Sequence, residues 1–186
     1  MKLLTYLSSV ISISKELEAE INSISKQVRV TKNSSVIKMD ERCSDLFFVE
    51  KGLLRGYYFD EAKEITNWFA EEGEFATCFY SFVANKPSFE IVQALEDCQL
   101  IRLSNSSLQN LYSKFPETER IGRIITENYY IKLEERLLNI QFKTAKERYS
   151  NLILSRPTLL QRASLGQIAA YLGITQETLS RIRSEI

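Results

Sequence analysis

The sequence predicts an α+β protein in which a β-sandwich or small barrel is followed by a long helix and a small helical module. Three observations predict this order. Short strand-like segments fill residues 27–104, a helical periodicity runs from about residue 116 to Phe142, and two short helices with a tight turn occupy the C-terminal end. The chain has 186 residues, which is enough for one or two domains with a proper core.

The first residues, Met1 to Leu4, faintly resemble the start of a signal peptide. Lys15 and Glu16 interrupt the apolar stretch, however, and no small-residue cleavage site follows. No run approaches the roughly 20 apolar residues that span a bilayer. We therefore expect a cytoplasmic protein with no membrane partner. Apolar residues at helical spacing predict one short packed helix at this end: Leu4, Leu7, Ile11, Leu17, Ile21 and Ile24.

Residues 27–104 contain short segments that are rich in β-branched and aromatic residues. Polar turns such as Lys51-Gly52, Asp60-Glu61 and Glu72-Gly73 separate them. Short strands at this spacing are typical of a sandwich or a small barrel. The expected strands are residues 28–30, 36–39, 46–49, 53–59 and 65–69.

A short helix is expected over residues 105–114, and Pro116 can open the next helix because proline is tolerated in a first turn.

The long helix carries two apolar stripes, which need two surfaces to pack against. The simplest solution is the protein's own barrel on one side and a partner's identical helix on the other, that is, a homodimer. The alternative is a core helix in a monomer. The proposed dimer seam has heptad spacing, with polar residues that would fix its register: Ile121, Ile124, Asn128, Ile131, Glu135, Leu138 and Phe142. The second stripe is Ile125, Tyr129, Leu133, Leu137 and Ile140.

After a helix from Thr144 to about Ser155 and a break at Arg156-Pro157, residues 164–182 have the pattern of a helix-turn-helix. Ala169 is small where the two helices would touch, and Gly173 accepts the left-handed conformation that the tight turn favours. Ser164 with Gln167 predicts a capping box, and Thr175 can cap the second helix. The five positions that must be buried are apolar: Ile168, Leu172, Ile174, Leu179 and Ile182.

The outer face of the second helix carries side chains that read base edges in a DNA major groove. Arginine pairs with guanine, glutamine with adenine, and glutamate accepts from cytosine, while serine and threonine can meet bases or phosphate. Solvated polar residues on any surface helix would look similar, so the face is informative only together with the turn and the buried positions. The candidate DNA-binding residues are Ser164, Thr175, Gln176, Glu177, Thr178, Ser180 and Arg181.

Charge gives weaker support. Lys plus Arg and Asp plus Glu both number 24, but residues 143–186 carry seven Lys or Arg against three Glu, which leaves 17 against 21 for residues 1–142. A basic C-terminal module on an acidic body suggests different partners for the two ends, although chance scatter could give so small an excess.

The chain contains no histidine, which removes histidine-based metal sites, the usual catalytic triads and histidine-ligated haem. Three cysteines, Cys43, Cys78 and Cys98, are too far apart for a zinc or iron–sulfur motif and are odd in number, so we expect buried free thiols. We therefore predict that the protein is not an enzyme and holds no metal or cofactor.

On these residues the chain resembles the cyclic AMP receptor protein/FNR family of bacterial regulators over nearly its whole length. Leu46 to Gly52 looks like the family's strand-turn entry, and Glu72-Gly73-Glu74-Phe75 like the opening of its phosphate-binding cassette. Residues 116–142 resemble its dimerisation helix, and 175–182 its recognition helix. Residues 144–149 and 171–175 are similar to the Bacteroidetes branch.

The resemblance implies a jelly roll (a double-stranded β-helix) as the sensor-like N-terminal domain. It also implies that Gln176, Glu177 and Arg181 hold base-reading positions and that Ser164 touches phosphate. Relatives often continue into a β-wing beyond the position of Ile182, and whether this chain has one stays open.

The likeness fails at the effector pocket. Thr77 and Cys78 stand where cyclic-nucleotide binders hold a glycine–glutamate pair, and Ser88 stands where an arginine pairs with the cyclic phosphate. Leu133 and Glu134 replace the polar pair that meets the base. Burying a phosphate without its charge partner is costly. We therefore expect no useful binding of cyclic AMP. A different small molecule in a pocket of Thr77, Cys78, Ser88 and Leu133, a thiol signal at Cys78, or no effector at all remain open.

Together these inferences predict three parts: a sensor domain over residues 1–115, a dimerisation helix over 116–142 and a helix-turn-helix domain over 143–186. The dimer would read a pseudo-palindrome in double-stranded DNA, and would also contact RNA polymerase if it is an activator. One alternative is a ligand-sensing or protein-interaction module whose helix-turn-helix no longer binds DNA. Another is a metal-dependent enzyme on the same barrel, which lacks the histidine ligands that such barrels use.

Overall fold

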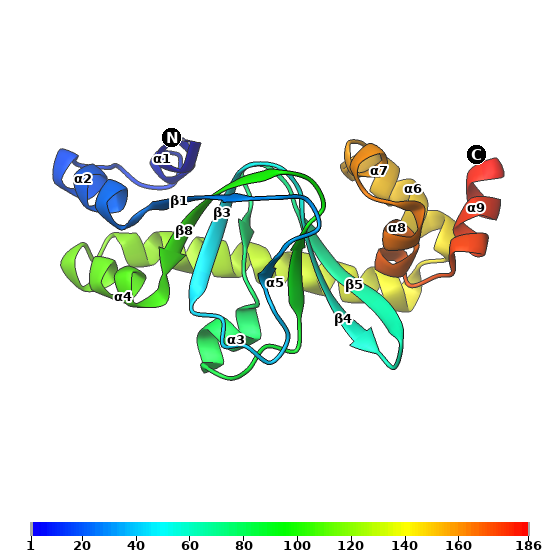
Figure 1. The fold of residues 1–186 in the computed structure, drawn as a ribbon. Coiled ribbons are helices and arrows are strands. Elements are labelled where there is room, and N and C mark those ends of the chain that lie inside the picture. The colour runs from blue at the N-terminus through cyan, green and yellow to red at the C-terminus, as the bar shows by residue number, and fades with distance from the viewer. Residues whose placement is uncertain (1, 186) are drawn as a thin grey trace.

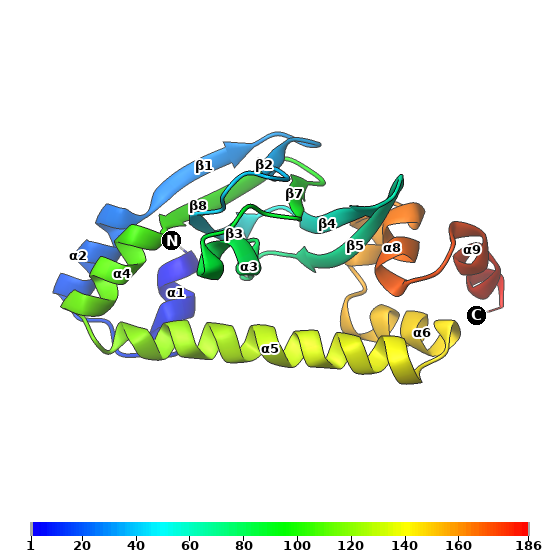
Figure 2. The same ribbon diagram turned by 90° about the horizontal axis from the view of Figure 1, so that it is seen from below.

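The computed structural model describes residues 2–185 and places two four-stranded sheets at the centre of the chain. Helices lie at both ends of this sandwich, and one long helix runs along its side and connects the two ends (Figures 1 and 2). This is the mixed α+β architecture that the sequence predicts. Among residues 2–185, no helix combines the length and apolarity needed to cross a membrane.

The first sheet has the order β1-β8-β3-β6 and the second the order β2-β7-β4-β5. All pairs are antiparallel, as in a jelly roll. The bounds of the first sheet are Lys26–Val30 for β1, Cys98–Ser104 for β8, Asp45–Lys51 for β3 and Phe75–Ala76 for β6. Those of the second are Ser35–Ile37 for β2, Ile91–Ala94 for β7, Leu54–Asp60 for β4 and Lys63–Ala70 for β5.

Successive residues of a strand point to opposite faces, and the first sheet uses both. In β3, Phe47 and Val49 enter the core between the two sheets, whereas Phe48 enters a second core under the N-terminal helices. In β8, Leu100 and Ile101 divide in the same way. The first sheet is therefore covered on its outer face by helices. These are α1 (Lys2–Ser8), α2 (Lys15–Ile24), α4 (Asn105–Lys114) and the beginning of α5 (Thr118–Phe142).

The N-terminal segment forms two helices, so the expectation of one helix was wrong. The chain leaves α1 after Ser8, and Ser14 begins α2 by accepting a hydrogen bond from the Leu17 backbone. Val10, Ile11 and Ile13, between the two helices, are β-branched and disfavour a helical backbone there. The apolar spacing was still informative, because Leu7, Leu17 and Ile21 are buried in the same core.

Three smaller expectations also need correction. Within the expected strand region, Phe79–Ala84 forms the short helix α3. Pro116 lies in a turn ahead of α5, whose N-cap is Glu117, so the proline is not in the first turn of the helix. The break at Arg156-Pro157 is followed by an extra short helix, α7 (Leu159–Arg162), between α6 (Ala145–Ser155) and the helix-turn-helix.

Candidate nucleic-acid interface and sensor site

The helix-turn-helix consists of α8 (Leu165–Leu172) and α9 (Gln176–Ser184), joined at Gly173. Gly173 has φ 67° and ψ 37°, in the left-handed region. The backbone N–H of Ile174 donates to the Ala169 carbonyl at 3.0 Å, and that of Gly173 to the Ala170 carbonyl at 3.2 Å. This pair of bonds closes the end of α8 and turns the chain sharply into α9. The expected role of the glycine is confirmed.

The predicted caps are also confirmed. The Ser164 hydroxyl accepts from the Gln167 backbone at 3.2 Å, and the Gln167 side chain accepts from the Ser164 backbone at 2.9 Å. Thr175 caps α9 by accepting from the Thr178 backbone at 3.2 Å. These bonds satisfy N–H groups that have no partner inside a helix, so both helix starts are fixed by local sequence.

The inner face of the motif is packed as the spacing predicts. Ala169 is 2% exposed where the helices meet, and four of the five apolar positions are buried, Ile168, Leu172, Leu179 and Ile182. Ile174 is half-buried. The same core also contains barrel residues: Leu53, Phe69 and Leu95 pack into it. The motif is thus seated on the barrel while α9 lies on the side away from it (Figure 2).

The candidate DNA-binding residues lie mainly on the solvent side of α9 and at the start of α8. Ser164, Thr175, Gln176, Glu177, Ser180 and Arg181 are exposed, and Thr178 is half-buried. The Glu177 carboxylate accepts hydrogen bonds from the Glu177 backbone N–H and from the Thr175 side chain, and these bonds lower its pKa. The carboxylate is therefore ionised and can accept hydrogen bonds but not donate them. The face therefore presents acceptors from Glu177 and donors from Arg181 on one helix.

The sequence suggested that the excess of positive charge in residues 143–186 serves a separate partner, but part of this charge is neutralised within the protein. Two of its seven cations, Arg156 and Arg162, are paired with barrel carboxylates rather than directed outward. Lys146 pairs with Glu185 at 3.6 Å. The outward basic groups on α9 are Arg181 and Arg183. The overall excess of positive charge in the segment is therefore a poor guide to the charge on the candidate DNA-binding face of α9.

The candidate sensor residues Thr77, Cys78 and Ser88 are all buried, and each is bonded within the protein. Thr77 donates to the Asp45 carbonyl at 2.9 Å, and Ser88 donates to the Glu90 carbonyl at 2.8 Å. The Cys78 thiol donates to the same Glu90 carbonyl at 3.6 Å. Leu133, the fourth expected member, is 48% exposed on α5 and is not brought to these three.

Glu90 is a sensor-site residue that the sequence reasoning missed. It is 4% exposed, and its carboxylate accepts from the Asn67 amide at 2.5 Å and from the Trp68 indole at 3.4 Å. Burial raises its pKa, only partly offset by these two hydrogen bonds. Tyr129 of α5 stacks on Phe79 with ring centroids 4.9 Å apart. A buried carboxylate therefore lies two residues from Ser88, the position at which the resemblance to cyclic-nucleotide binders would require an arginine. A glutamate immediately before the apolar strand β7 was the available signal.

The three cysteines are buried and free, as expected. Burial, reinforced by the nearby Glu90 and Cys43, raises the pKa of Cys78 to about 12 in spite of a hydrogen bond with Ser88. A thiol in this environment is protonated at neutral pH and is a poor nucleophile, which disfavours the thiol signal. Within residues 2–185, no group of three or more Cys, Asp or Glu side chains is arranged to hold a metal ion.

The expected dimer seam is only partly available on the surface. Ile121 is 7% exposed and belongs to the core under the N-terminal helices, so its assignment to the seam was wrong. The reason is that α5 begins beneath α4, where that core still needs apolar side chains. Ile124 is half-buried, and the later seam positions are exposed: Asn128, Ile131, Glu135, Leu138 and Phe142.

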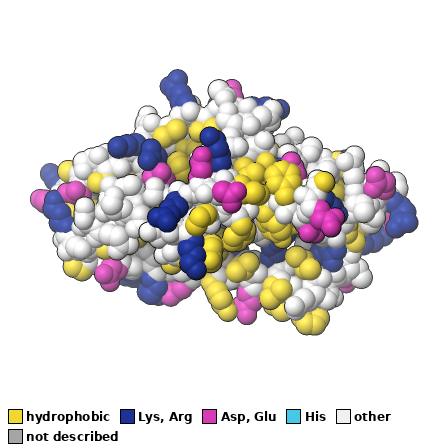
Figure 3. Space-filling view, turned by 60° about the horizontal axis from the view of Figure 1, so that its bottom comes forward, with side chains coloured by type: hydrophobic (Ala, Val, Ile, Leu, Met, Phe, Trp, Pro, Cys, Tyr) yellow, Lys and Arg dark blue, Asp and Glu magenta, His cyan; other side chains and the backbone are white. Residues whose placement is uncertain are grey.

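The second stripe also divides along the length of α5. Ile125 and Tyr129 pack against the protein's own body, as expected. Leu133, Leu137 and Ile140 are 48%, 53% and 46% exposed. Figure 3 shows hydrophobic side chains gathered over the middle and lower part of one face. The second half of α5 is thus apolar on both stripes and open to solvent.

Comparison with known proteins identifies the architecture. Residues 27–115 match the family described as "Cyclic nucleotide-binding domain". No curated protein matches the chain in sequence. The structure is similar to that of FixK2 from Bradyrhizobium japonicum, with a TM-score of 0.76, 22% identity and coverage of 87% of this chain and 84% of that one. The chain has the Crp/Fnr fold.

Two further structures extend the comparison. The c-di-GMP-responsive global regulator CLP of Xanthomonas campestris has a TM-score of 0.73 at 18% identity, over 92% of this chain and 91% of that one. A candidate crp/fnr-family transcriptional regulator from Eubacterium rectale gives 0.73 at 16% identity, over 93% and 83%. TM-scores at this level establish the shared fold, and identities of 16–22% extend the likeness no further than the fold. The Bacteroidetes branch stays a prediction.

Within the Crp/Fnr fold, two arginines hold the end of α8 in a way that sequence reasoning did not find. Arg136 of α5 donates to the Tyr171 carbonyl at 2.8 Å and to the Thr66 carbonyl of β5 at 3.0 Å, and it lies 4.4 Å from the Tyr171 ring centroid. Arg148 of α6 donates to the Leu172 carbonyl at 2.9 Å. Cations suit the carbonyl end of a helix. These bonds join residues 24 to 70 positions apart, a distance over which spacing carries no signal.

The glycine corner yields a stability prediction. We expect Gly173→Ala to lower the free energy of unfolding by about 1 kcal/mol, because alanine is strained at a left-handed φ although the site has room for the methyl group. Gly166→Ala is the matched control in α8, where the methyl group would meet only the end of the Gln176 side chain, at 3.1 Å. Urea denaturation of both variants measures the difference. Equal stability of the two would contradict the role of the corner.

Proposed function

We propose that this protein is a homodimeric, sequence-specific DNA-binding transcription regulator of the Crp/Fnr type that does not respond to cyclic AMP. The observation that carries the proposal is the polar face of α9, exposed beyond a corner at Gly173. Its Gln176, Glu177 and Arg181 have the hydrogen-bonding groups that distinguish bases in the major groove. The sensor domain (residues 1–115), dimerisation helix (116–142) and helix-turn-helix domain (143–186) are the proposed working parts.

The dimer is supported by the second half of α5. Monomeric soluble proteins rarely expose large contiguous apolar patches, and larger ones mark interaction sites. Pairing of two copies through α5 would cover this patch and would present two α9 helices to successive major grooves, about 34 Å apart. The proposed operator is accordingly a pseudo-palindrome. RNA polymerase is a further partner if the regulator is an activator.

The lack of a response to cyclic AMP is supported by the sensor site. Ser88 stands where the resemblance places the arginine that pairs with a cyclic phosphate, and it is bonded to the backbone of Glu90, whose carboxylate is buried. Thr77, Cys78 and Ser88 already use their hydrogen-bonding groups within the protein. Like charges brought together in a desolvated site are unfavourable. An effector of different chemistry, or none, is compatible with this arrangement.

A first prediction concerns base reading. Selection from a random duplex library should give a preferred sequence, and Arg181→Ala should weaken binding to it by about 5- to 150-fold, the loss of one bidentate base contact of about 1–3 kcal/mol. Arg123→Ala, which removes an exposed cation of α5, should leave the affinity unchanged. Fluorescence anisotropy at fixed salt measures both. If the full chain selects no sequence, the protein-interaction alternative replaces this proposal.

A second prediction concerns the dimer. Ile131 and Leu138 are 51% and 48% exposed in the single chain. The double substitution Ile131→Glu/Leu138→Glu should convert the protein to a monomer, because it would bury two carboxylates from each of the two copies in the seam. Leu154→Glu, at a position on α6 that is 82% exposed, is the control and should remain dimeric. Sedimentation equilibrium gives the masses. A monomeric unsubstituted protein at micromolar concentration would contradict the homodimer.

A third prediction concerns the effector. Isothermal titration of the full chain with cyclic AMP or cyclic GMP should show no binding with a micromolar dissociation constant, because Ser88 stands where the resemblance places the arginine that pairs with the cyclic phosphate. Thermal denaturation at 1 mM nucleotide is an independent check, since a ligand that binds only the folded state raises the melting temperature. Micromolar binding in the titration would refute this part of the proposal.

A further inference from the structure

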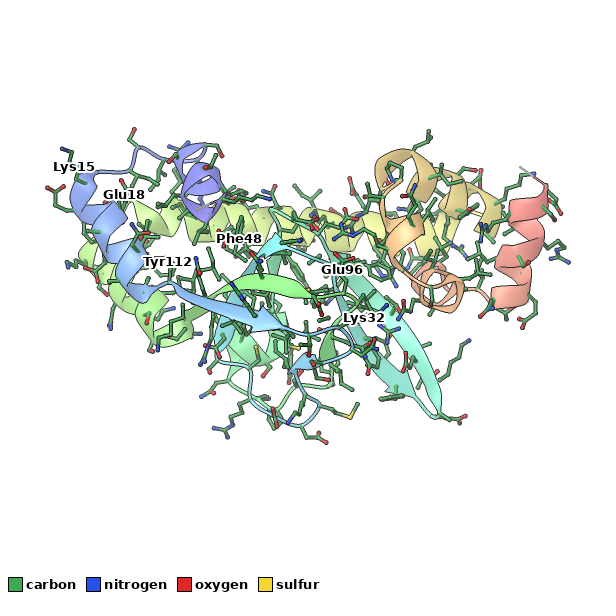
Figure 4. The ribbon with its side chains drawn as sticks, turned by 45° about the horizontal axis from the view of Figure 1, so that its top comes forward. Lys15, Glu18, Lys32, Phe48, Glu96 and Tyr112 are labelled. Carbon is green, nitrogen blue, oxygen red and sulfur yellow. The ribbon has the colours of Figure 1, made fainter. Side chains whose placement is uncertain are left out.

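Four barrel carboxylates form a group that faces the C-terminal helices. Glu71, Glu72 and Glu74 lie in the turn between β5 and β6, and Glu96 lies in the turn between β7 and β8. We call these four residues the collar. Figure 4 labels Glu96 on the side of the barrel toward the C-terminal helices, at the opposite end from Lys15 and Glu18 on α2. Four neighbouring carboxylates repel one another unless cations are placed among them.

Two arginines of the C-terminal helices supply those cations. Arg162, at the end of α7, donates two bonds of 2.9 Å to Glu72, and bonds of 2.6 and 3.3 Å to Glu96. Arg156, the C-cap of α6, donates to Glu74 at 3.0 Å, to Glu71 at 3.4 Å and to the Phe69 carbonyl at 3.2 Å. Arg162 is therefore held in bidentate fork geometry by each of two carboxylates, and Arg156 by single bonds to three barrel groups.

The charged state of these contacts is stable near neutral pH. Burial alone would raise the pKa of Glu72, but hydrogen bonds from Arg162 and from the Gly52 backbone outweigh it and lower the pKa to about 2. Burial would likewise raise the pKa of Glu74, but Arg156 and Lys132 lower it. Glu72 and Glu74 therefore stay ionised beside Arg162 and Arg156 across the neutral range.

The collar touches the other two parts of the molecule as well. Lys132 of α5 donates to Glu74 at 2.5 Å. The turn that carries Glu74 continues through Phe75 and Ala76 of β6 into Thr77 and Cys78 of the sensor site. One short turn is thus bonded to the C-terminal helices and to the dimer helix, and leads directly into the sensor residues. A displacement of this turn would therefore act on both Arg156 and Lys132, the two cations that are bonded to Glu74.

Ion pairs contribute something here that apolar packing does not. Burial of Leu53, Phe69 and Leu95 against the C-terminal helices is driven by the hydrophobic effect, which is non-directional, so only the packing of these side chains restrains the angle between the two bodies. Bidentate arginine–carboxylate bonds have a defined geometry. Their side chains are still 20–35% exposed, so water and salt can compete with them.

We propose that Arg156 and Arg162 are positioning residues for DNA reading, which fix the orientation of α9 relative to the dimer helix by docking the C-terminal helices on the collar. The docking of the C-terminal helices is argued from the ion pairs, and its effect on DNA reading rests on the proposed DNA-binding function. It assigns to the collar a role that the sensor site and the base-reading residues do not have: setting the half-site spacing that the dimer accepts.

The test uses the full chain with fluorophores at two exposed positions, Arg29→Cys on β1 and Ser184→Cys on α9, since the native cysteines are buried. Labelled protein is diluted into unlabelled protein so that one protomer of any dimer carries the dyes. Energy transfer should report one narrow distance in the parent. Glu72→Gln/Glu96→Gln should broaden it, because the uncharged amides cannot hold Arg162 as firmly. Arg123→Gln, which breaks an exposed pair within α5, should not change it.

Two further measurements separate positioning from folding. Arg162→Lys keeps the charge without the fork and should restore only part of the narrow distribution. In the parent, raising salt from 0.05 to 1 M should broaden the distribution, since screening weakens partly exposed pairs. On duplexes with varied half-site spacing, Glu72→Gln/Glu96→Gln should lose about 5-fold or more of the parent's spacing preference, while binding a single half-site equally well.

The outcomes are distinguishable. An unchanged energy-transfer distribution in Glu72→Gln/Glu96→Gln and at high salt overturns the positioning role, whatever DNA the protein binds. A broadened distribution with an unchanged spacing preference also overturns it. A broadened distribution in a chain that selects no DNA overturns the proposed function and, with it, the consequence for reading, and leaves only the docking geometry.

Discussion

The helix-turn-helix depends on a core that it does not supply alone. Its two helices and their neighbours α6 and α7 are short, and their buried side chains meet Leu53, Phe69 and Leu95 of the barrel, with Leu53 and Leu159 fully buried at the contact. Burying one such side chain contributes about 1.5–3 kcal/mol, whereas a partly exposed ion pair contributes about 0–1 kcal/mol. The apolar contact therefore holds the C-terminal helices in place, and the charged and polar bonds around it determine their orientation.

This division explains why cations gather where they do. Arg136 and Arg148 bond carbonyls at the end of α8, and Arg156 and Arg162 bond the carboxylates of the barrel turns. All four lie around the apolar contact rather than on the surface that would meet DNA. The side chains left for base reading on α9 are few and mostly uncharged, which suits direct reading of bases, because phosphate contacts position a protein whereas base contacts specify the sequence.

The parts of the fold that sequence predicted are those set by neighbouring residues. The capping residues Ser164 and Thr175, the left-handed Gly173 and the small Ala169 act within a few positions, so their pattern was sufficient to place α8 and α9. The β-sandwich followed from alternating strands and turns for the same reason. Ile121 was misplaced because its partners come from α1, α2 and α4, and the spacing within α5 does not distinguish a core position from a seam position. Glu90 was missed because its partners lie on β5.

The two halves of the long helix α5 have different surroundings, so the apolar spacing along the helix does not by itself tell which residues face the core and which face solvent. One side of its first half is covered by the N-terminal helices and by Phe79, which stacks on Tyr129, so Ile121, Ile125 and Tyr129 pack within the chain. Its second half has Arg136 on the side toward β5 and α8, yet it retains exposed apolar residues on two stripes. Contacts with the core, contacts with the end of α8 and the exposed apolar residues therefore fall on different lengths and faces of α5. The same helix therefore links the proposed partner surface to the end of α8, through the bond from Arg136 to the Tyr171 carbonyl.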